Sequence, residues 1–122
     1  PSKEIVIVSI DTQSLENIGS WPWPRELHAS LLDRLSSARS VGLDLIFAEP
    51  TVYTPETDQM LANAIKRNGR VVLPVLPEIV NGRLVETTPL PAFVHAASGL
   101  GHIDTARDSD GVIRRTFLIL PL

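Results

Sequence analysis

The stretch Ile5-Val6-Ile7-Val8-Ser9-Ile10-Asp11 decides the fold class of this chain. Its aliphatic run has no alternating polar positions, which is typical of a strand buried on both faces in a parallel sheet covered by helices. Asp11 ends the run, so a carboxylate is expected at the carboxyl end of the strand, where open α/β sheets usually bind their ligands. Asp11 is equally suited to be the N-cap of a short helix over residues 12–18, and both interpretations stay open.

A strand–helix–strand unit follows from the next part of the chain. Residues 25–38 carry apolar side chains at helical spacing, and residues 41–47 repeat the buried-strand pattern. Such a unit has a right-handed crossover, so the two strands are expected to pair in parallel. Asp44 interrupts the second strand and needs a partner if it is buried. Arg25 is the expected partner, and a direct ligand contact is the alternative.

The remaining elements complete an α/β fold. We expect a helix that starts at Thr54-Pro55-Glu56 and is ended by Asn68-Gly69, and then a strand over residues 70–76, in which Pro74 predicts an edge position, a bulge or the strand's end. Asn81-Gly82 favours a type I′ hairpin. The predicted fold is a single α/β domain over residues 1–122, with a mostly parallel sheet covered by helices and a small peripheral hairpin.

The C-terminal part is expected to form an antiparallel strand pair. A short helix over residues 89–98 precedes a predicted strand at residues 102–104, and residues 112–120 form the last strand. The connection between these two strands is too short for a crossover helix, which excludes parallel pairing.

Composition excludes several classes of function. The net charge of −3 argues against a nucleic-acid partner, because a phosphate-binding surface needs an excess of lysine and arginine. The absence of cysteine excludes disulfides, thiolate metal sites and cysteine nucleophiles. No stretch approaches the roughly 18 consecutive apolar residues of a membrane span. Strand-like segments nevertheless reach almost to both ends, so we expect the chain to be excised from a longer protein.

The candidate site residues are aromatic and charged side chains that favour binding over catalysis. Trp21-Pro22-Trp23-Pro24-Arg25 is an extended segment that serves either as a lid over the core or as the wall of a pocket. No phosphate loop, nucleophile elbow or histidine pair at metal spacing occurs, and no cofactor is expected. The ligand-binding candidates, expected to gather at one edge of the sheet, are Asp11, Trp21, Trp23, Arg25, Asp44, Glu49, His102 and Asp104.

An alternative uses the acidic residues as metal ligands. Asp11, Glu49 and Asp104 all lie at predicted strand ends, and carboxylates there suit a hard cation such as magnesium. This pattern allows a metal-dependent hydrolase built on Asp11, although it is less specific than the binding interpretation.

Several motifs in one order resemble a known family. The sequence resembles the CHASE domain of type two, a sensory extracellular module of bacterial receptors, over nearly its whole length. The motifs that carry the resemblance are the strand ending in Asp11, Trp21-Pro22-Trp23-Pro24-Arg25 with His28, residues 42–50, residues 58–65, Gly101-His102-Ile103, and Asp110-Gly111-Val112-Ile113-Arg114-Arg115.

The resemblance implies a receptor rather than an enzyme. Family members lie outside the cytoplasmic membrane, are flanked by membrane helices, and regulate an adenylate cyclase, diguanylate cyclase or kinase inside. This chain would be the sensor alone, with an unidentified small ligand or with self-association as a homodimer. It departs from the family in lacking the flanking helices and the extra amino-terminal stretch, and in being short around Asn81-Gly82. The alternative is a structural or dimerising ectodomain that binds no small ligand.

Overall fold

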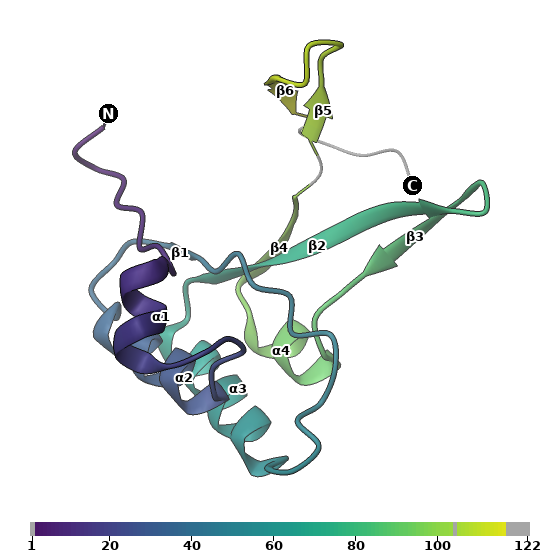
Figure 1. Ribbon diagram of the computed structural model, residues 1–122. Helices are drawn as coiled ribbons and strands as arrows, with labels where there is room; N and C mark the ends of the chain where they lie inside the picture. Colours follow the sequence, from purple (N-terminus) through teal and green to yellow (C-terminus); the bar gives the residue numbers. More distant parts are fainter. Residues whose placement is uncertain (1, 104, 117–122) are drawn as a thin grey trace.

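The computed structural model of this chain describes residues 2–103 and 105–116 (Figure 1). The described residues form four helices, all in the first hundred residues, and six strands, three of which follow the last helix. The helices are α1 (Thr12–Ile18), α2 (Arg25–Arg34), α3 (Glu56–Asn68) and α4 (Pro91–Ala96). The strands are β1 (Val41–Gly42), β2 (Val71–Val80), β3 (Arg83–Thr87), β4 (Gly99–His102), β5 (Thr105–Arg107) and β6 (Ile113–Thr116).

The main sheet is mixed and is built around β2. The first half of β2 pairs in parallel with β1 and with β4, and its second half pairs antiparallel with β3. The α/β class is therefore confirmed, whereas the description of the sheet as mostly parallel is not. Figure 1 shows β2 and β3 projecting as a long ribbon from the body that holds the helices.

Pro74 lies in the central strand and not at an edge of the sheet. Parallel pairing of β2 with β1 stops at Val72, whereas pairing with β4 continues to Val75. The carbonyl groups of Val71 and Val75 face β4, where they accept hydrogen bonds from Ser98 and Ile103. Because backbone groups alternate in direction along a strand, the nitrogen of Pro74 faces the side that β1 has already left. The missing N–H group therefore costs no ladder hydrogen bond.

The ribbon turn confirms the prediction made from Asn81-Gly82. Both residues have positive φ angles, 51° at Asn81 and 74° at Gly82, as a type I′ turn requires. β2 and β3 are in register across this turn, with Val80 opposite Arg83.

The antiparallel C-terminal pair is also confirmed, but with a different first strand. β5 pairs with β6, and Thr105 lies opposite Thr116. The predicted strand over residues 102–104 is wrong in its bounds, because β4 covers Gly99–His102 and belongs to the main sheet. Asp104 lies outside the described residues, as does the predicted continuation of the last strand beyond residue 116.

The prediction of a buried strand at the amino terminus is wrong in this structure. Residues 5–10 form no strand, and Ile7 is 85% exposed. The expected neighbour offers them little to pair with, because a local hydrogen bond from the Leu45 N–H to the Leu43 carbonyl, 2.8 Å long, bends the chain directly after β1. As a result, β1 is only two residues long.

The core lies between the helices and one face of the sheet. Its largest side chains are completely buried and come from α2, α3, α4 and β2; they are Phe93, Leu32, Leu61, Ile65, Leu73 and Val71. α3 ends as the sequence predicts, with Gly69 in the left-handed conformation at φ 75°. α1 contributes no buried residue.

Candidate functional site

A shallow groove lies where β1 and β4 end, on either side of the first half of β2. Its volume is about 250 Å³, and apolar side chains and glycines form most of its lining. We call it the strand-end groove; its residues are Gly42, Leu43, Asp44, Val72, Leu73, Pro74, Gly101, His102 and Ile103. The carboxyl ends of parallel strands are the usual location of ligand sites in α/β proteins.

Two polar side chains in the groove are candidates for direct ligand contacts. The Asp44 carboxylate is exposed, so it has no need of the ion pair that the sequence suggested. His102 is half-buried, and its Nδ1 atom has no hydrogen-bond partner among the residues that the structure describes. A buried imidazole nitrogen normally has a partner, so this atom is suited to receive one from a bound molecule.

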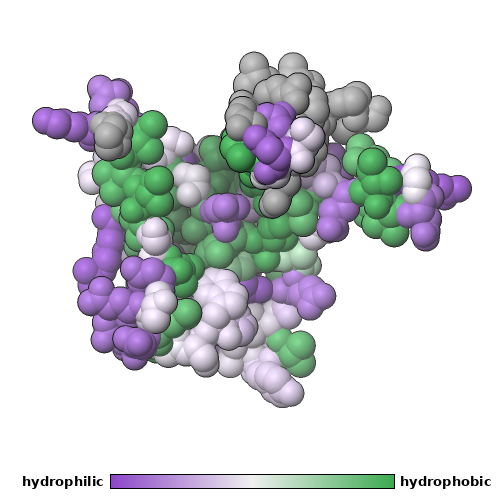
Figure 2. Space-filling view, turned by 45° about the horizontal axis from the view of Figure 1, so that its top comes forward, coloured by the Kyte–Doolittle hydropathy of each residue, from purple (hydrophilic) through white to green (hydrophobic). Residues whose placement is uncertain are grey.

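Hydrophobic residues surround these polar groups on the outer surface. Figure 2, which turns the top of Figure 1 toward the viewer, shows hydrophobic residues gathered over the middle of that face, between the amino-terminal segment and the β2–β3 ribbon. The exposed apolar residues on this chain include Leu100 and Ile103, which are 44% and 39% exposed. A largely apolar site with a few polar groups is the common composition of small-molecule pockets.

Trp21 and Trp23 belong to a second cluster, a chain of aromatic rings that packs beside Arg25. The ring centroids of Trp21 and His28 are 5.7 Å apart, those of His28 and Phe47 are 5.2 Å apart, and those of Phe47 and Phe93 are 5.8 Å apart. Trp23 lies 5.7 Å from Trp21 and donates its indole N–H to the Gly19 carbonyl at 2.7 Å. None of the tryptophans lines the strand-end groove. Trp21 and Trp23 therefore pack over the core like a lid.

Arg25 is held by contacts in three directions. Its Nε atom donates to Asp58 Oδ1 at 3.0 Å, and Nη2 donates to the Glu49 carbonyl at 2.9 Å. The guanidinium group also lies over the ring of Phe47, at 4.3 Å from its centroid. The predicted pairing with Asp44 is wrong, because Asp58 at the start of α3 is the partner. Glu49 contributes its backbone carbonyl, while its side chain is exposed.

Asp58, on α3, connects the start of α2 with the loop at Thr51. The sequence did not identify it as the partner of Arg25. Besides Arg25, it accepts hydrogen bonds from the Thr51 N–H at 2.8 Å and from the Thr51 hydroxyl at 2.9 Å. Burial raises the pKa of the Asp58 carboxyl, but the hydrogen bonds from Thr51 and Arg25 outweigh it, and the pKa lies below its ordinary value. The ionised carboxylate thus fixes the loop after residue 47 against α2 and α3.

Asp11 acts as the N-cap of α1. Its Oδ1 atom accepts hydrogen bonds from the Ser14 N–H at 2.9 Å and from the Ser14 hydroxyl at 2.7 Å. These two bonds lower the pKa of the Asp11 carboxyl. The capping interpretation is thus confirmed, and the side chain does not line the strand-end groove in this structure.

His28 is buried in the aromatic chain without a polar contact. It is only 3% exposed, and its Nε2 atom has no partner within the described part of the chain. Burial and the nearby positive charge of Arg25 both lower the pKa of His28 below its ordinary value of 6.5. The folded protein therefore holds this ring neutral at neutral pH.

Stability should consequently fall on mild acidification because of His28. The unfolded chain binds a proton below about pH 6.5 while the folded chain does not, so the free energy of unfolding falls as the pH drops from 6.5, by at most about 1.4 kcal/mol per pH unit. Urea unfolding between pH 7.5 and 5.5 measures this slope. His28→Phe, which keeps an aromatic ring, should flatten it, whereas His95→Ala at an exposed position should not; equal slopes in all three proteins would contradict the assignment.

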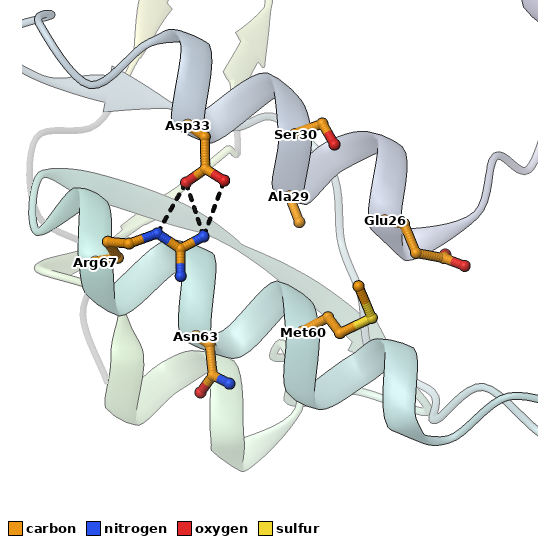
Figure 3. A pocket seen from close by; sticks show the side chains of 7 residues that line it. All are labelled: Glu26, Ala29, Ser30, Asp33, Met60, Asn63 and Arg67. Carbon is orange, nitrogen blue, oxygen red and sulfur yellow. Dashed lines mark hydrogen bonds and ion pairs between the residues drawn. The ribbon is translucent and has the colours of Figure 1, made fainter.

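A second groove, absent from the sequence-based prediction, lies between α2 and α3 (Figure 3). It also has a volume of about 250 Å³. Arg67 crosses its end and makes three hydrogen bonds of 2.8 to 3.0 Å to the Asp33 carboxylate. These two charges are therefore paired with each other, whereas Glu26, which also lines this groove, has a buried Oε2 atom without a partner among the described residues.

The described residues offer neither a metal centre nor a membrane helix. Within residues 2–103 and 105–116, no three His, Asp or Glu side chains come together in a way that would hold a metal ion. No helix in the same ranges is long and apolar enough to cross a membrane.

Comparison with known proteins places the chain in a family. Neither a curated protein nor a solved structure matches it. The model of the CHASE2 domain matches residues 1–122, which is the entire chain. The motifs that resembled the type-two CHASE domain in the sequence thus belong to a match of full length, and this chain is a member of the CHASE2 domain family.

Proposed function

We propose that this chain is the extracytoplasmic sensory domain of a bacterial transmembrane signalling protein, and that it binds a small ligand in the strand-end groove. CHASE2 domains are sensory modules of receptors and are not catalytic. The observation that supports the groove is the half-buried His102, whose Nδ1 atom lacks a partner among the described residues and which shares the groove with the Asp44 carboxylate. These two side chains are the proposed direct contacts.

The lining indicates the chemistry of the ligand. The Asp44 carboxylate can only accept hydrogen bonds, so it favours an amine or hydroxyl group, and the His102 ring can accept or donate one at Nδ1. The remainder of the groove consists of aliphatic side chains, proline and glycine. A small molecule with one polar, hydrogen-bonding end and one apolar end fits this arrangement.

The other candidates serve the site indirectly in this proposal. Trp21, Trp23 and Arg25 fix the segment after β1, because Arg25 binds the Glu49 carbonyl and stacks on Phe47. The turn directly after β1 carries Asp44 into the groove. The ligand then shifts the domain between two arrangements in proportion to its differential affinity for them, and membrane helices of the parent protein carry that shift to a cyclase or kinase domain.

A ligand screen with matched variants tests this function. In a thermal-shift panel of metabolites, a ligand at about 100 times its Kd should stabilise the domain by roughly 2.7 kcal/mol. Asp44→Asn and His102→Ala should each weaken the response at least about tenfold in apparent Kd, since each leaves a ligand group unpaired.

Two exposed residues provide the controls for this screen. Glu86→Gln on β3 and His95→Ala on α4 remove the same chemical groups from exposed positions outside the groove. Both variants should respond like the wild type. A ligand whose binding is unaffected by Asp44→Asn and His102→Ala would place the site elsewhere, and a panel without any response would count against a small ligand.

A dimerising ectodomain is the second candidate function, and one observation favours it. The ribbon exposes aliphatic side chains near its tip, with Ile79 78% exposed and Leu84 47% exposed on the opposite strand. Exposed apolar surface of this kind often marks a protein interface. Light scattering that shows a dimer lost in Ile79→Asp, together with a flat ligand panel, would favour this function over the first.

A further inference from the structure

The groove between α2 and α3 carries a polar atom whose hydrogen-bonding capacity is unused (Figure 3). The Oε2 atom of Glu26 is buried and accepts no hydrogen bond from the residues that the structure describes. Glu26 is in the first turn of α2, where a carboxylate is favoured by the positive end of the helix dipole. The dipole explains the position of this acid but supplies no donor to Oε2. A half-buried carboxylate in this state is suited to a cationic, hydrogen-bonding ligand.

α2 and α3 run in the same direction, so the groove has two different ends. The ion pair of Arg25 with Asp58, 3.0 Å long, joins the first turns of the two helices. The ion pair of Arg67 with Asp33, 2.8 Å long, joins their last turns. Figure 3 accordingly shows Glu26 at one end of the groove and Arg67 at the other.

Arg67 keeps free donors at its end of the groove although it is paired with Asp33. Its three hydrogen bonds to that carboxylate use Nε and Nη2. Figure 3 shows the third nitrogen, Nη1, turned away from Asp33. A guanidinium group has five N–H donors in a fixed fork, so it can bind a second carboxylate through Nη1. The last turns also carry Arg34 and Lys66, which add positive charge to this end.

The middle of the groove adds no further charge and sets the length of a ligand. Its lining there comes from Ala29 and Ser30 on α2 and from Met60 and Asn63 on α3. Glu26 and Asp33, which holds the Arg67 guanidinium, are seven positions apart on α2, or about 10 Å at the helical rise. Hydrogen bonds of about 2.9 Å at both ends leave about 4–5 Å for the ligand. A chain of three methylene groups between an ammonium and a carboxylate group fits this length.

We propose that the groove between α2 and α3 binds a small linear amino acid of the 4-aminobutanoate type, with its ammonium group on Glu26 and its carboxylate on Nη1 of Arg67. The ligand supplies the hydrogen-bond donor that Glu26 lacks and uses the free donors of Arg67. Neither residue lines the strand-end groove, so this second site is independent of the first. Because the ligand touches both helices, it would favour the arrangement of the domain in which α2 and α3 keep this spacing.

A series of ligands tests the site in the unmodified chain. In NMR titrations to about 10 mM, 4-aminobutanoate should shift the amide signals of Ala29 and Met60 and saturate with a Kd near about 1 mM, as expected for two charged contacts in a shallow groove. Glycine is too short to reach both ends and should bind at least about tenfold more weakly. Butylamine and butanoate each lack one of the two charges and should be weakened to the same extent.

Matched variants assign the two ends of the ligand. Glu26→Gln and Arg67→Gln should each weaken 4-aminobutanoate at least about tenfold, because each removes the charge at one end of the groove. The pair of Arg67 with Asp33 is more than half exposed on the arginine side, so its loss leaves the fold intact. Glu16→Gln on α1 and Arg83→Gln on β3 remove the same chemical groups from exposed positions outside the groove and should bind like the wild type.

Three results would overturn the proposal. Titrations without saturable shifts would show that the groove does not take this class of ligand. Equal affinity of the wild type and Glu26→Gln, or of the wild type and Arg67→Gln, would place the site elsewhere. Equal binding of butylamine and 4-aminobutanoate would show that the carboxylate makes no contact with Arg67.

Discussion

Replacing Phe93 with alanine should lower the free energy of unfolding by about 3–5 kcal/mol, because it leaves a large cavity at the centre of the core. Phe93 is completely buried on α4, and its ring packs against Phe47 at a centroid distance of 5.8 Å. Urea unfolding followed by tryptophan fluorescence measures the change, since Trp21 lies in the same chain of rings.

An exposed aromatic residue provides the control for this prediction. Tyr53→Ala removes a ring that is 95% exposed, and it should change the free energy of unfolding by less than about 0.5 kcal/mol. If Phe93→Ala does not fold, Phe93→Leu offers a milder test, with an expected loss of about 1–2 kcal/mol. A loss below 1 kcal/mol for the alanine variant would contradict the position of α4 in the core.

Local signals in the sequence predicted the helices and turns well. The spacing of apolar residues gave the start of α2 at Arg25, although α2 ends at Arg34 and not at residue 38. In α3 it predicted a buried stripe of Met60, Leu61, Ala64 and Ile65, of which all but Met60, 49% exposed, are buried. Asp11 caps α1, and the turn at Asn81-Gly82 adopts the expected conformation. These features depend on contacts between residues close in sequence, so a short stretch contains the information that determines them.

Local patterns did not predict which segments of the chain form the sheet. Residues 5–10 carry the strongest strand pattern in the chain, yet they are exposed, while the central strand β2 contains Pro74. Strand formation depends on which neighbour offers a free edge and over what length, and this is set by distant segments. The turn at Leu43, which shortens β1, and the pairing of β4 with β2 have no clear local signal.

The sequence predicted one site, but the structure divides its residues between two places. Asp44 and His102 lie together in the strand-end groove, whereas Trp21, Trp23 and Arg25 pack in the aromatic chain. The sequence suggested Arg25 as the partner of Asp44, and this pairing was wrong. The actual partner, Asp58, follows 33 residues later and meets Arg25 only through the packing of α2 on α3. An acidic residue in the first turn of a helix is so common that it does not reveal a partner.

Replacing Arg25 with alanine should destabilise the domain by about 2–4 kcal/mol, through loss of the charged hydrogen bonds and of the stacking on Phe47. The Arg25 side chain is 18% exposed and that of Asp58 is 14% exposed, so water replaces the lost contacts poorly. Arg25→Lys should recover only part of the loss, because an ammonium group cannot reach Asp58 and the Glu49 carbonyl with the geometry of the guanidinium fork.

A double-mutant cycle separates the ion pair from the other roles of Arg25. Unfolding of Arg25→Ala, Asp58→Asn and the double variant should give a coupling energy of about 1–3 kcal/mol, as expected for groups in one partly buried network. The pair Arg67 and Asp33 is the matched control, because its side chains are 58% and 50% exposed, and its coupling should stay below about 1 kcal/mol. Equal coupling in the two cycles would mean that Arg25 is no better held than a surface residue. In that case Arg25 would be available to a ligand, and the division between a supporting cluster and a separate groove would have to be abandoned.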